Sequence, residues 1–207
     1  MAIPIVEAFW KPQEAIEEIK KERNLSVPIV YLIIAGILTA ISFALLGYSA
    51  GGTVSSEGRP LAQLLNNPGI AAVGGFLIVL IGGLLGGLYY MLVMGALKTK
   101  SDYFAGVATL AHTAMPASLG LLIVSILSLI PKAGPIIGAI IGLVFFALSA
   151  GTLYNATREF FETDMITALV GVTAFSLSIS MVVLAAAFPQ LPNLLSKVTS
   201  SQPPAAP

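Results

Sequence analysis

The stretch IAAVGGFLIVLIGGLLGGLYYMLVMGAL, residues 70–97, carries no Asp, Glu, Lys or Arg. A helix needs about 20 mostly apolar residues to cross the hydrocarbon core of a bilayer, so this stretch is long enough to cross with some tilt. Four more uncharged apolar stretches occupy residues 27–48, 105–130, 136–156 and 166–188. Their apolar runs are continuous, whereas the strands of a membrane barrel alternate apolar and polar residues. The sequence therefore predicts an all-α integral membrane protein, a bundle of five transmembrane helices.

The composition of the whole chain agrees with this architecture. Of its 207 residues, 57% are hydrophobic and 10% are charged, and the mean hydropathy is +0.93. A soluble domain carries about 25% charged residues, so this chain has too few charges to cover a water-exposed surface. The formal net charge is zero, which predicts no nucleic-acid partner. With no cysteine and one histidine, we expect no disulfide, no metal site and no cofactor.

The chain divides into three parts. Residues 1–26 form a charged, amphipathic segment, residues 27–188 hold the five spans, and residues 189–207 are rich in Pro, Ser and Ala and are typical of a flexible tail. The charged opening does not fit a cleavable signal peptide. We therefore expect the first span to serve as an uncleaved signal anchor, and the amphipathic segment to lie in the cytosol or at the membrane interface.

Basic residues predict the orientation of the spans. With five spans, the N-terminal segment and the loops after the second and fourth spans face one side and hold seven Lys or Arg residues, against three on the other side. The seven are Lys11, Lys20, Lys21, Arg23, Lys98, Lys100 and Arg158, and the three are Arg59, Lys132 and Lys197. Cytoplasmic loops are enriched in Lys and Arg. We therefore expect a cytoplasmic N-terminus and an external C-terminus.

A short amphipathic helix is predicted before the first span. Pro12 suits the first turn of a helix, and Ile16 and Ile19 fall on one face of it. The aromatic residues Phe9 and Trp10 precede it, and such residues favour the membrane interface. The apolar face has two interpretations: it meets lipid or a partner protein, or it packs against the bundle. Phe9, Trp10, Pro12, Ile16 and Ile19 are therefore candidate interface residues.

Two short strings resemble catalytic motifs but lack the required partners. Residues 47–51, GYSAG, spell the G-x-S-x-G of serine hydrolases, which needs a strand-to-helix turn with an acid and a histidine at the serine. Here Ser49 ends the first span, whereas His112 lies toward the opposite side of the membrane in the third. The adjacent Glu17 and Glu18 lie outside the spans and are typical of a solvated helix face. We predict no catalytic residue and no enzyme.

His112 is the only side chain in a predicted span that titrates near neutral pH, which makes it a candidate intramembrane polar site. Pro116 removes the backbone N–H that would bond to the carbonyl of His112. Polar backbone beside an imidazole is typical of a proton-sensing or solute site. The alternative, which we favour because no carboxylate lies in any span, is a neutral histidine bonded to Thr109, Thr113 or a neighbouring helix.

Closely spaced glycines predict helix packing. Small residues four apart let helix backbones approach each other in lipid. We expect these glycines to mark contacts within one bundle rather than between protomers, with self-association as the alternative. They are Gly82, Gly83, Gly86 and Gly87 in the second span and Gly134, Gly138 and Gly142 at the start of the fourth.

Several segments resemble the Yip-domain (Ypt-interacting-protein) family of five-span membrane proteins. Residues 9–12, FWKP, with the short helix that follows, are similar to the aromatic-x-Pro opening of that family. Residues 111–116, AHTAMP, resemble its GYS..P stretch entering the third span, with His112 in place of the usual tyrosine. The fourth span ending near Tyr154 and the charges through Asp164 are also similar. The resemblance covers nearly all of residues 5–188.

The resemblance implies a non-enzymatic role in membrane organisation or as an adaptor for other proteins. Eukaryotic relatives act in ER–Golgi trafficking and bind prenylated Rab-type GTPases. This sequence lacks their long N-terminal region and their D-L-Y-G-P motif, so we do not extend GTPase binding to it. It is more similar to the short prokaryotic members, which implies a prokaryotic plasma membrane. A small channel or transporter using His112, or an accessory subunit of a membrane complex, remains as an alternative function.

Overall fold

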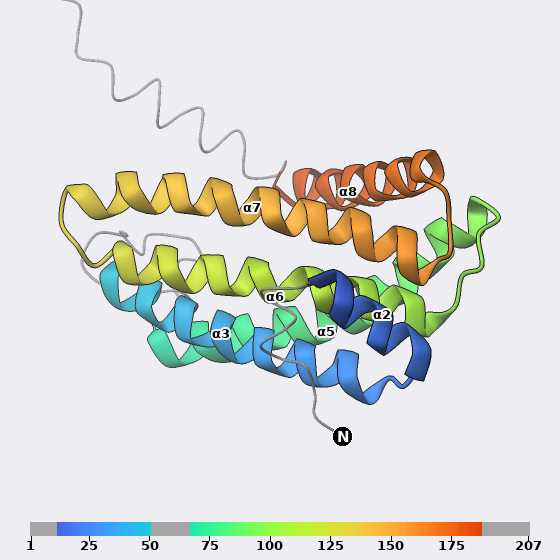
Figure 1. Cartoon of the computed structure of the whole chain (residues 1–207). Helices are drawn as coiled ribbons and strands as arrows, with labels where there is room; N and C mark the ends of the chain where they lie inside the picture. Colours follow the sequence, from blue (N-terminus) through green and yellow to red (C-terminus); the bar gives the residue numbers. More distant parts are fainter. Residues whose placement is uncertain (1–11, 51–66, 188–207) are drawn as a thin grey trace, which may run out of the picture.

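The computed structural model describes residues 12–50 and 67–187, which fold into helices joined by short turns (Figure 1). A short helix lies against one end of a bundle of five long, roughly parallel helices. In chain order these are α2 (Pro12–Glu22), α3 (Ser26–Ala50), α5 (Pro68–Ala96), α6 (Tyr103–Leu127), α7 (Ala133–Phe160) and α8 (Met165–Ala187). All five long helices are apolar enough to cross a membrane. The predicted all-α five-span architecture is confirmed.

The long helices begin one to three residues before the predicted spans, and at α5, α6 and α8 a polar residue caps the first turn. Asn67 accepts hydrogen bonds from the backbone N–H groups of Gly69 and Ile70 at 3.0 and 3.3 Å. Asp102 starts α6 and Asp164 starts α8 in the same manner. Such residues satisfy N–H groups that have no partner inside the helix. A criterion based only on apolar residues omits this first turn.

The fourth span also ends later than predicted. Helix α7 continues from Ala156, the predicted end, to Phe160 through Arg158 and Glu159. Charged residues are good helix formers, so they end the apolar run without ending the helix. With 28 residues, α7 is about 42 Å long. A helix of this length exceeds a hydrocarbon core of about 30 Å, and the charged residues of α7 all lie in its last turns.

Helices α6 and α7 form an antiparallel hairpin. The turn between them places Lys132 in the left-handed backbone region, at φ 65°. Immediately after it, a Cβ on Gly134 would overlap the carbonyl oxygen of Leu127, so only glycine fits this close approach. Left-handed residues also occupy the other described connections, at Arg23, Lys98 and Glu162.

Helix α6 lies at the centre of the bundle, and the outer surfaces are apolar. Its first turns are buried almost all round, as shown by Ala105, Val107 and Ala108, each 0% exposed. By contrast, Leu85 of α5 and Phe146 of α7 are 63% and 72% exposed. A soluble protein rarely exposes such large contiguous apolar surfaces, whereas a bilayer covers them. The predicted tail at 189–207 lies outside the described residues.

Candidate functional site

Helix α2 is docked on the bundle by its apolar face. Ala15, Ile16 and Ile19 are at most 2% exposed and share one core cluster with Tyr31 of α3 and Phe160 of α7. The face that the sequence offered to a partner is therefore occupied by the chain itself, in agreement with the packing interpretation. Pro12 begins α2 as predicted, while Phe9 and Trp10 lie outside the described residues.

Salt bridges hold the polar face of α2 to the neighbouring turns. Lys20 Nζ lies 3.7 Å from a carboxylate oxygen of Glu159 and 3.8 Å from one of Glu162. Glu162 also accepts a 2.7 Å hydrogen bond from Lys100. Exposed ion pairs contribute little singly and more in a network. This network joins α2 to the α5–α6 and α7–α8 turns.

Arg23 connects α2 to the start of α6. Its guanidinium pairs with the carboxylate of Asp102, which also caps α6 through the N–H of Ala105 at 2.7 Å. The same guanidinium lies 5.7 Å from the centre of the Phe104 ring, within the range of a cation–π contact. One arginine therefore contacts both a capping carboxylate and an aromatic ring of the core.

Two carboxyl groups at this end have lowered pKa values. The hydrogen bond from Lys100, the charge of Lys100 and the charge of Lys20 lower the pKa of Glu162. Hydrogen bonds from the side chain and backbone of Thr167 lower the pKa of Asp164. Both groups favour the charged form because their donors stabilise the carboxylate.

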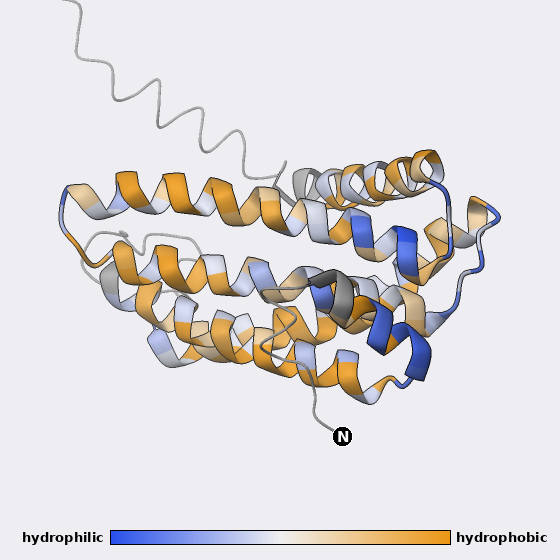
Figure 2. Ribbon diagram, in the orientation of Figure 1, coloured by the Kyte–Doolittle hydropathy of each residue, from blue (hydrophilic) through white to orange (hydrophobic). Residues whose placement is uncertain are grey.

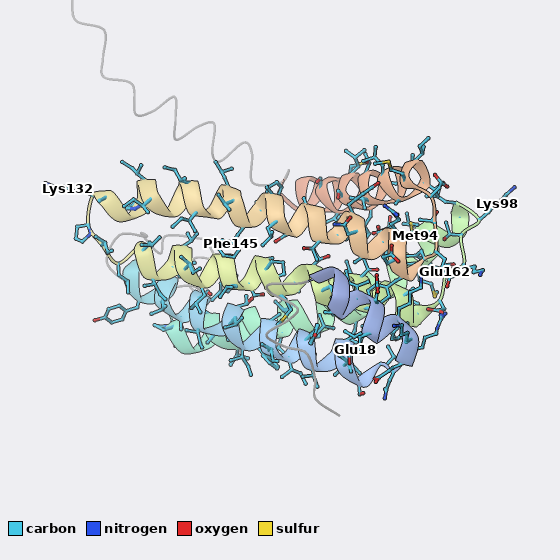
Figure 3. All side chains as sticks on the ribbon, viewed as in Figure 1. Glu18, Met94, Lys98, Lys132, Phe145 and Glu162 are labelled. Carbon is cyan, nitrogen blue, oxygen red and sulfur yellow. The ribbon has the colours of Figure 1, made fainter. Side chains whose placement is uncertain are left out.

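We use the name charged collar for α2, the last turn of α7, and the turns at residues 97–102 and 161–164. Every charged residue in the described parts of the chain lies in the collar or the adjoining Arg23, except Lys132 at the opposite end. Figure 2 shows the hydrophilic residues concentrated at this end of the bundle, and Figure 3 shows Lys98 and Glu162 far from Lys132. The collar thus brings together the N-terminal segment and the loops after the second and fourth spans, which a five-span topology places on one side.

His112 lies in an aromatic box formed by neighbouring helices. Its ring centre is 5.1 Å from that of Tyr31 on α3 and 5.4 Å from that of Phe160 on α7. His112 Nδ1 lies 2.8 Å from the carbonyl oxygen of Ala108, which only accepts, so in the neutral ring Nδ1 carries the proton and donates. Nε2 is then an acceptor, and it has no partner among the described residues.

This geometry differs in detail from the predicted hydrogen bonds of His112. Thr113 bonds back to the carbonyl of Thr109 at 2.8 Å, and the hydroxyl of Thr109 has no partner among the described residues. The favoured alternative, a histidine bonded within the bundle, agrees with the structure, but its partner is Ala108 and not a threonine. Pro116 lies one turn further on within α6.

His112 lies at the level of the last turns of α7. The ring of Phe160 contacts both His112 and Phe104, at 5.4 and 5.9 Å between ring centres. Phe160 lies in the last turn of α7, within two residues of Arg158 and Glu159. His112 is thus shielded in the protein interior, beside the end of α7 that carries Arg158 and Glu159.

Most of the predicted packing glycines lie at helix contacts. A Cβ on Gly83 would overlap the Leu32 side chain, one on Gly87 would lie 2.8 Å from the Val107 nitrogen, and one on Gly86 would lie 2.9 Å from Leu110 Cδ1. In α7, Gly138 and Gly142 face Val124 at 3.7 and 3.4 Å, ordinary contact distances.

Gly82 differs from its neighbours, because a Cβ there would meet no atom within 4 Å. It is exposed on the outer side of α5 and makes no helix contact within the described chain. Spacing alone also missed Gly106, whose Cβ would overlap the carbonyl oxygen of Gly87, and Gly120, whose Cβ would overlap Phe145. Neither has a glycine four residues away, so the G-x-x-x-G pattern does not find them.

Among the described residues, the two segments that resemble catalytic motifs do not lie in a cluster of catalytic or metal-binding side chains. Glu17 and Glu18 are both exposed on α2, and the side chain of Ser49 lies outside the described residues. Within the described ranges, no three His, Asp or Glu residues are grouped so that they could hold a metal ion.

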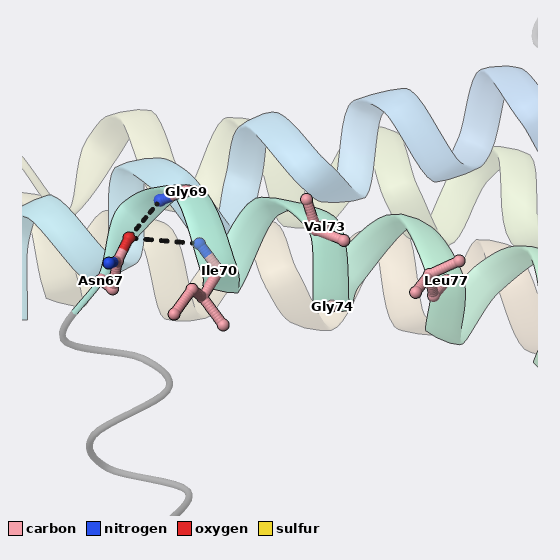
Figure 4. A pocket seen from close by; sticks show the side chains of 6 residues that line it. All are labelled: Asn67, Gly69, Ile70, Val73, Gly74 and Leu77. Atoms are coloured by element: carbon pink, nitrogen blue, oxygen red, sulfur yellow. Dashed lines mark hydrogen bonds between the residues drawn. The ribbon is translucent and has the colours of Figure 1, made fainter.

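A shallow hollow at the start of α5 is lined by apolar side chains and one amide (Figure 4). Ile70, Val73 and Leu77 contribute the apolar lining, and the side-chain oxygen of Asn67 is already used in capping the helix. This lining offers no nucleophile and no titratable group.

The sequence profile of the Yip1 domain matches residues 6–187, which includes α2 and all five long helices. The chain belongs to the Yip1 family. No curated protein and no solved structure gives a significant match. The resemblance predicted from the aromatic opening and from residues 111–116 is therefore confirmed at the level of the family.

Membership assigns the docked α2 and the five-helix bundle to one Yip1 domain. The match begins before α2, so α2 lies within the matched domain. This agrees with its buried Ile16 and Ile19. The collar and the aromatic box are therefore features of the domain itself.

Proposed function

We propose that this Yip1-family protein is a non-enzymatic adaptor that organises other membrane proteins, and that the charged collar is its recognition surface. The observation that carries the proposal is the concentration of charge at one end of an otherwise apolar bundle. Polar and charged groups at a contact supply orientation and specificity. The collar offers both signs of charge, which suits a protein partner better than nucleic acid.

We propose that the collar faces the cytoplasm of a prokaryotic cell and that the protein lies in the plasma membrane. The support for the orientation is the count of seven basic residues against three. On α2, Glu18, Lys21 and Glu22 are exposed and can then meet a partner directly. Ile16 and Ile19 act indirectly, by fixing α2 in place.

Co-purification from native membranes tests this proposal. We expect the double substitution Glu18→Lys with Glu22→Lys to remove the partners that co-purify with the unchanged protein, because both side chains are exposed and lie outside the described ion pairs. Lys132→Glu, at the opposite end, is the matched control and should retain them. Identical partner sets for the two variants would contradict the proposed surface.

A transport role predicts a different dependence. If the protein moved a solute or proton through His112, His112→Gln would abolish flux in proteoliposomes while the collar variants kept it. We expect His112→Gln to retain all co-purifying partners, because His112 is 2% exposed and cannot meet a partner directly. Flux that disappears with this substitution would replace the adaptor proposal by the transport alternative.

A further inference from the structure

Between α2 and α7 lies a small polar hollow, which we name the α2–α7 hollow. Its lining combines one buried aliphatic side chain, two carboxylates, one guanidinium and one amide, and its volume is about 170 Å³. Sites for drug-sized ligands measure about 300–1,000 Å³, so this hollow has room for a small polar group only. The lining residues are Ile16, Glu17, Asn155, Arg158 and Glu159.

The length of α7 places the hollow in the headgroup layer of a bilayer. About 20 residues cross the hydrocarbon core. Counted from Ala133, the first residue of α7, that distance ends near residue 153. Asn155, Arg158 and Glu159 follow within the next turns. The headgroup layers extend the total thickness to about 40–45 Å, comparable with the full length of α7.

The charges in the hollow are only partly used by the protein. Arg158 and Glu17 are exposed, and neither forms an ion pair with another described residue. A carboxylate oxygen of Glu159 lies 3.7 Å from Lys20 Nζ, farther than a direct hydrogen bond, and Lys20 also pairs with Glu162. Among the described residues, the hollow thus presents one cation without an ion pair and two carboxylates with acceptor capacity to a ligand at the membrane surface.

This combination selects among headgroups by their chemistry. A guanidinium binds phosphate through paired N–H donors, and a carboxylate accepts hydrogen bonds from a primary ammonium. A choline headgroup carries the same positive charge but has no N–H to donate. An anionic headgroup such as phosphoglycerol would place its charge beside two carboxylates without a compensating ammonium.

We propose that the α2–α7 hollow binds the headgroup of an ethanolamine phospholipid. Arg158 and the Asn155 amide bind the phosphate, and Glu17 and Glu159 accept hydrogen bonds from the ammonium. The lipid bridges α2 to α7 at the edge of the bundle. The hollow lies within the collar, but it uses the side of α2 that faces α7 and not Glu18 and Glu22, the residues that the co-purification experiment changes.

Native mass spectrometry of the full chain, released from nanodiscs of defined composition, tests the site. From equimolar phosphatidylethanolamine, phosphatidylcholine and phosphatidylglycerol, we expect the ethanolamine lipid to be retained about tenfold over each of the others, because one charge-assisted hydrogen bond corresponds to about that factor. Equal retention of the ethanolamine and choline lipids would overturn the proposal.

Matched variants distinguish lipid binding in the hollow from a general effect of surface charge on lipid retention. Arg158→Gln should lower retention of the ethanolamine lipid about tenfold, and Glu17→Gln should reduce the preference over phosphatidylglycerol. Lys98→Gln and Glu22→Gln, exposed collar residues outside the hollow, should change neither. Equal effects of Arg158→Gln and Lys98→Gln would contradict a specific site.

Free phosphoethanolamine distinguishes a lipid from a soluble ligand. We expect no displacement of the bound lipid by this compound, because it lacks the acyl chains that the bilayer retains. Displacement at micromolar concentration would mean that the hollow binds a soluble metabolite, and the lipid assignment would fail. As a control for folding, the melting temperature of each variant is measured in detergent. Substitutions of exposed side chains such as Arg158 should leave it unchanged.

Discussion

Gly87 of α5 and Gly106 of α6 meet backbone to backbone. A Cβ on Gly106 would overlap the carbonyl oxygen of Gly87, and a Cβ on Gly87 would lie 2.9 Å from the Cα of Val107. Lipid provides no hydrophobic drive for helix association, so such close packing is a main source of attraction. This contact joins the central helix α6 to α5 at the level of the collar.

We expect Gly106→Ala to destabilise the bundle. The added methyl group would meet backbone atoms of Gly87 and not a flexible side chain that could move away. The two helices must therefore separate, at a cost of about 1–3 kcal/mol. Thermal unfolding in detergent measures this loss. Gly82→Ala is the control, because it adds the same methyl group where no atom lies within 4 Å. Equal melting temperatures for both variants would show that the contact does not stabilise the fold.

Gly86→Leu and Gly138→Leu should each lower the melting temperature, whereas Gly138→Ala should be tolerated. A Cβ on Gly138 would lie 3.7 Å from Val124, an ordinary contact. A leucine adds three more carbon atoms beyond this contact, and we expect them to push α6 and α7 apart. At Gly86 even the Cβ would lie only 2.9 Å from Leu110. Unchanged stability of both leucine variants would contradict these packing positions.

The sequence was sufficient to predict the spans because the bilayer imposes a simple length rule. It was less informative about which helices touch. Gly83 and Gly87 were found by their spacing, yet Gly82 has the same spacing and faces outward. Gly106 was missed because its partner, Gly87, lies on another helix and leaves no pattern in the local sequence.

The collar was only partly predictable for the same reason. Charge counting placed Lys20, Lys100 and the α7–α8 turn on one side, but the two ion pairs that converge on Glu162 depend on tertiary contacts. For α2, the apolar face was found from periodicity. Periodicity does not distinguish a face that meets lipid from one that packs against α7, and burial of Ile16 decides between them.

Replacing His112 tests the aromatic box. We expect His112→Phe to keep the ring contacts with Tyr31 and Phe160 and to remove the unpartnered buried Nε2. An unsatisfied buried acceptor costs about 1–3 kcal/mol, so stability should be unchanged or higher. His112→Ala loses the packing as well and should destabilise by about 3 kcal/mol or more. Equal losses for the two variants would mean that a polar partner of Nε2 stabilises the native protein.

Acidification should loosen the collar through Glu162. Its pKa in the folded protein is lowered from about 4.5, so its contribution to stability is present above that value and is lost as the pH falls through the lowered pKa. We expect the protection of the α2 amides, measured relative to the intrinsic exchange rate at each pH, to fall below about pH 4.5. Glu162→Gln should show fast exchange already at neutral pH, and high salt should produce the same effect because the pairs are exposed. Protection of α2 that depends on neither pH nor Glu162 would show that this network does not hold α2 on the bundle.

Cysteine labelling tests the orientation of the collar. The chain contains no cysteine, so single substitutions report on one position each. Ser26→Cys, at the start of α3, keeps every charge, and Lys132→Cys leaves seven basic residues against two, which preserves the predicted orientation. In intact cells a membrane-impermeant maleimide should label position 132 and leave position 26 unlabelled until the membrane is permeabilised.

Ser196→Cys should be labelled in intact cells, as position 132 is, because five spans place the residues after α8 on that side. Labelling of position 26 in intact cells would place the collar outside, and the proposed cytoplasmic partner surface would then be wrong even if the fold is correct.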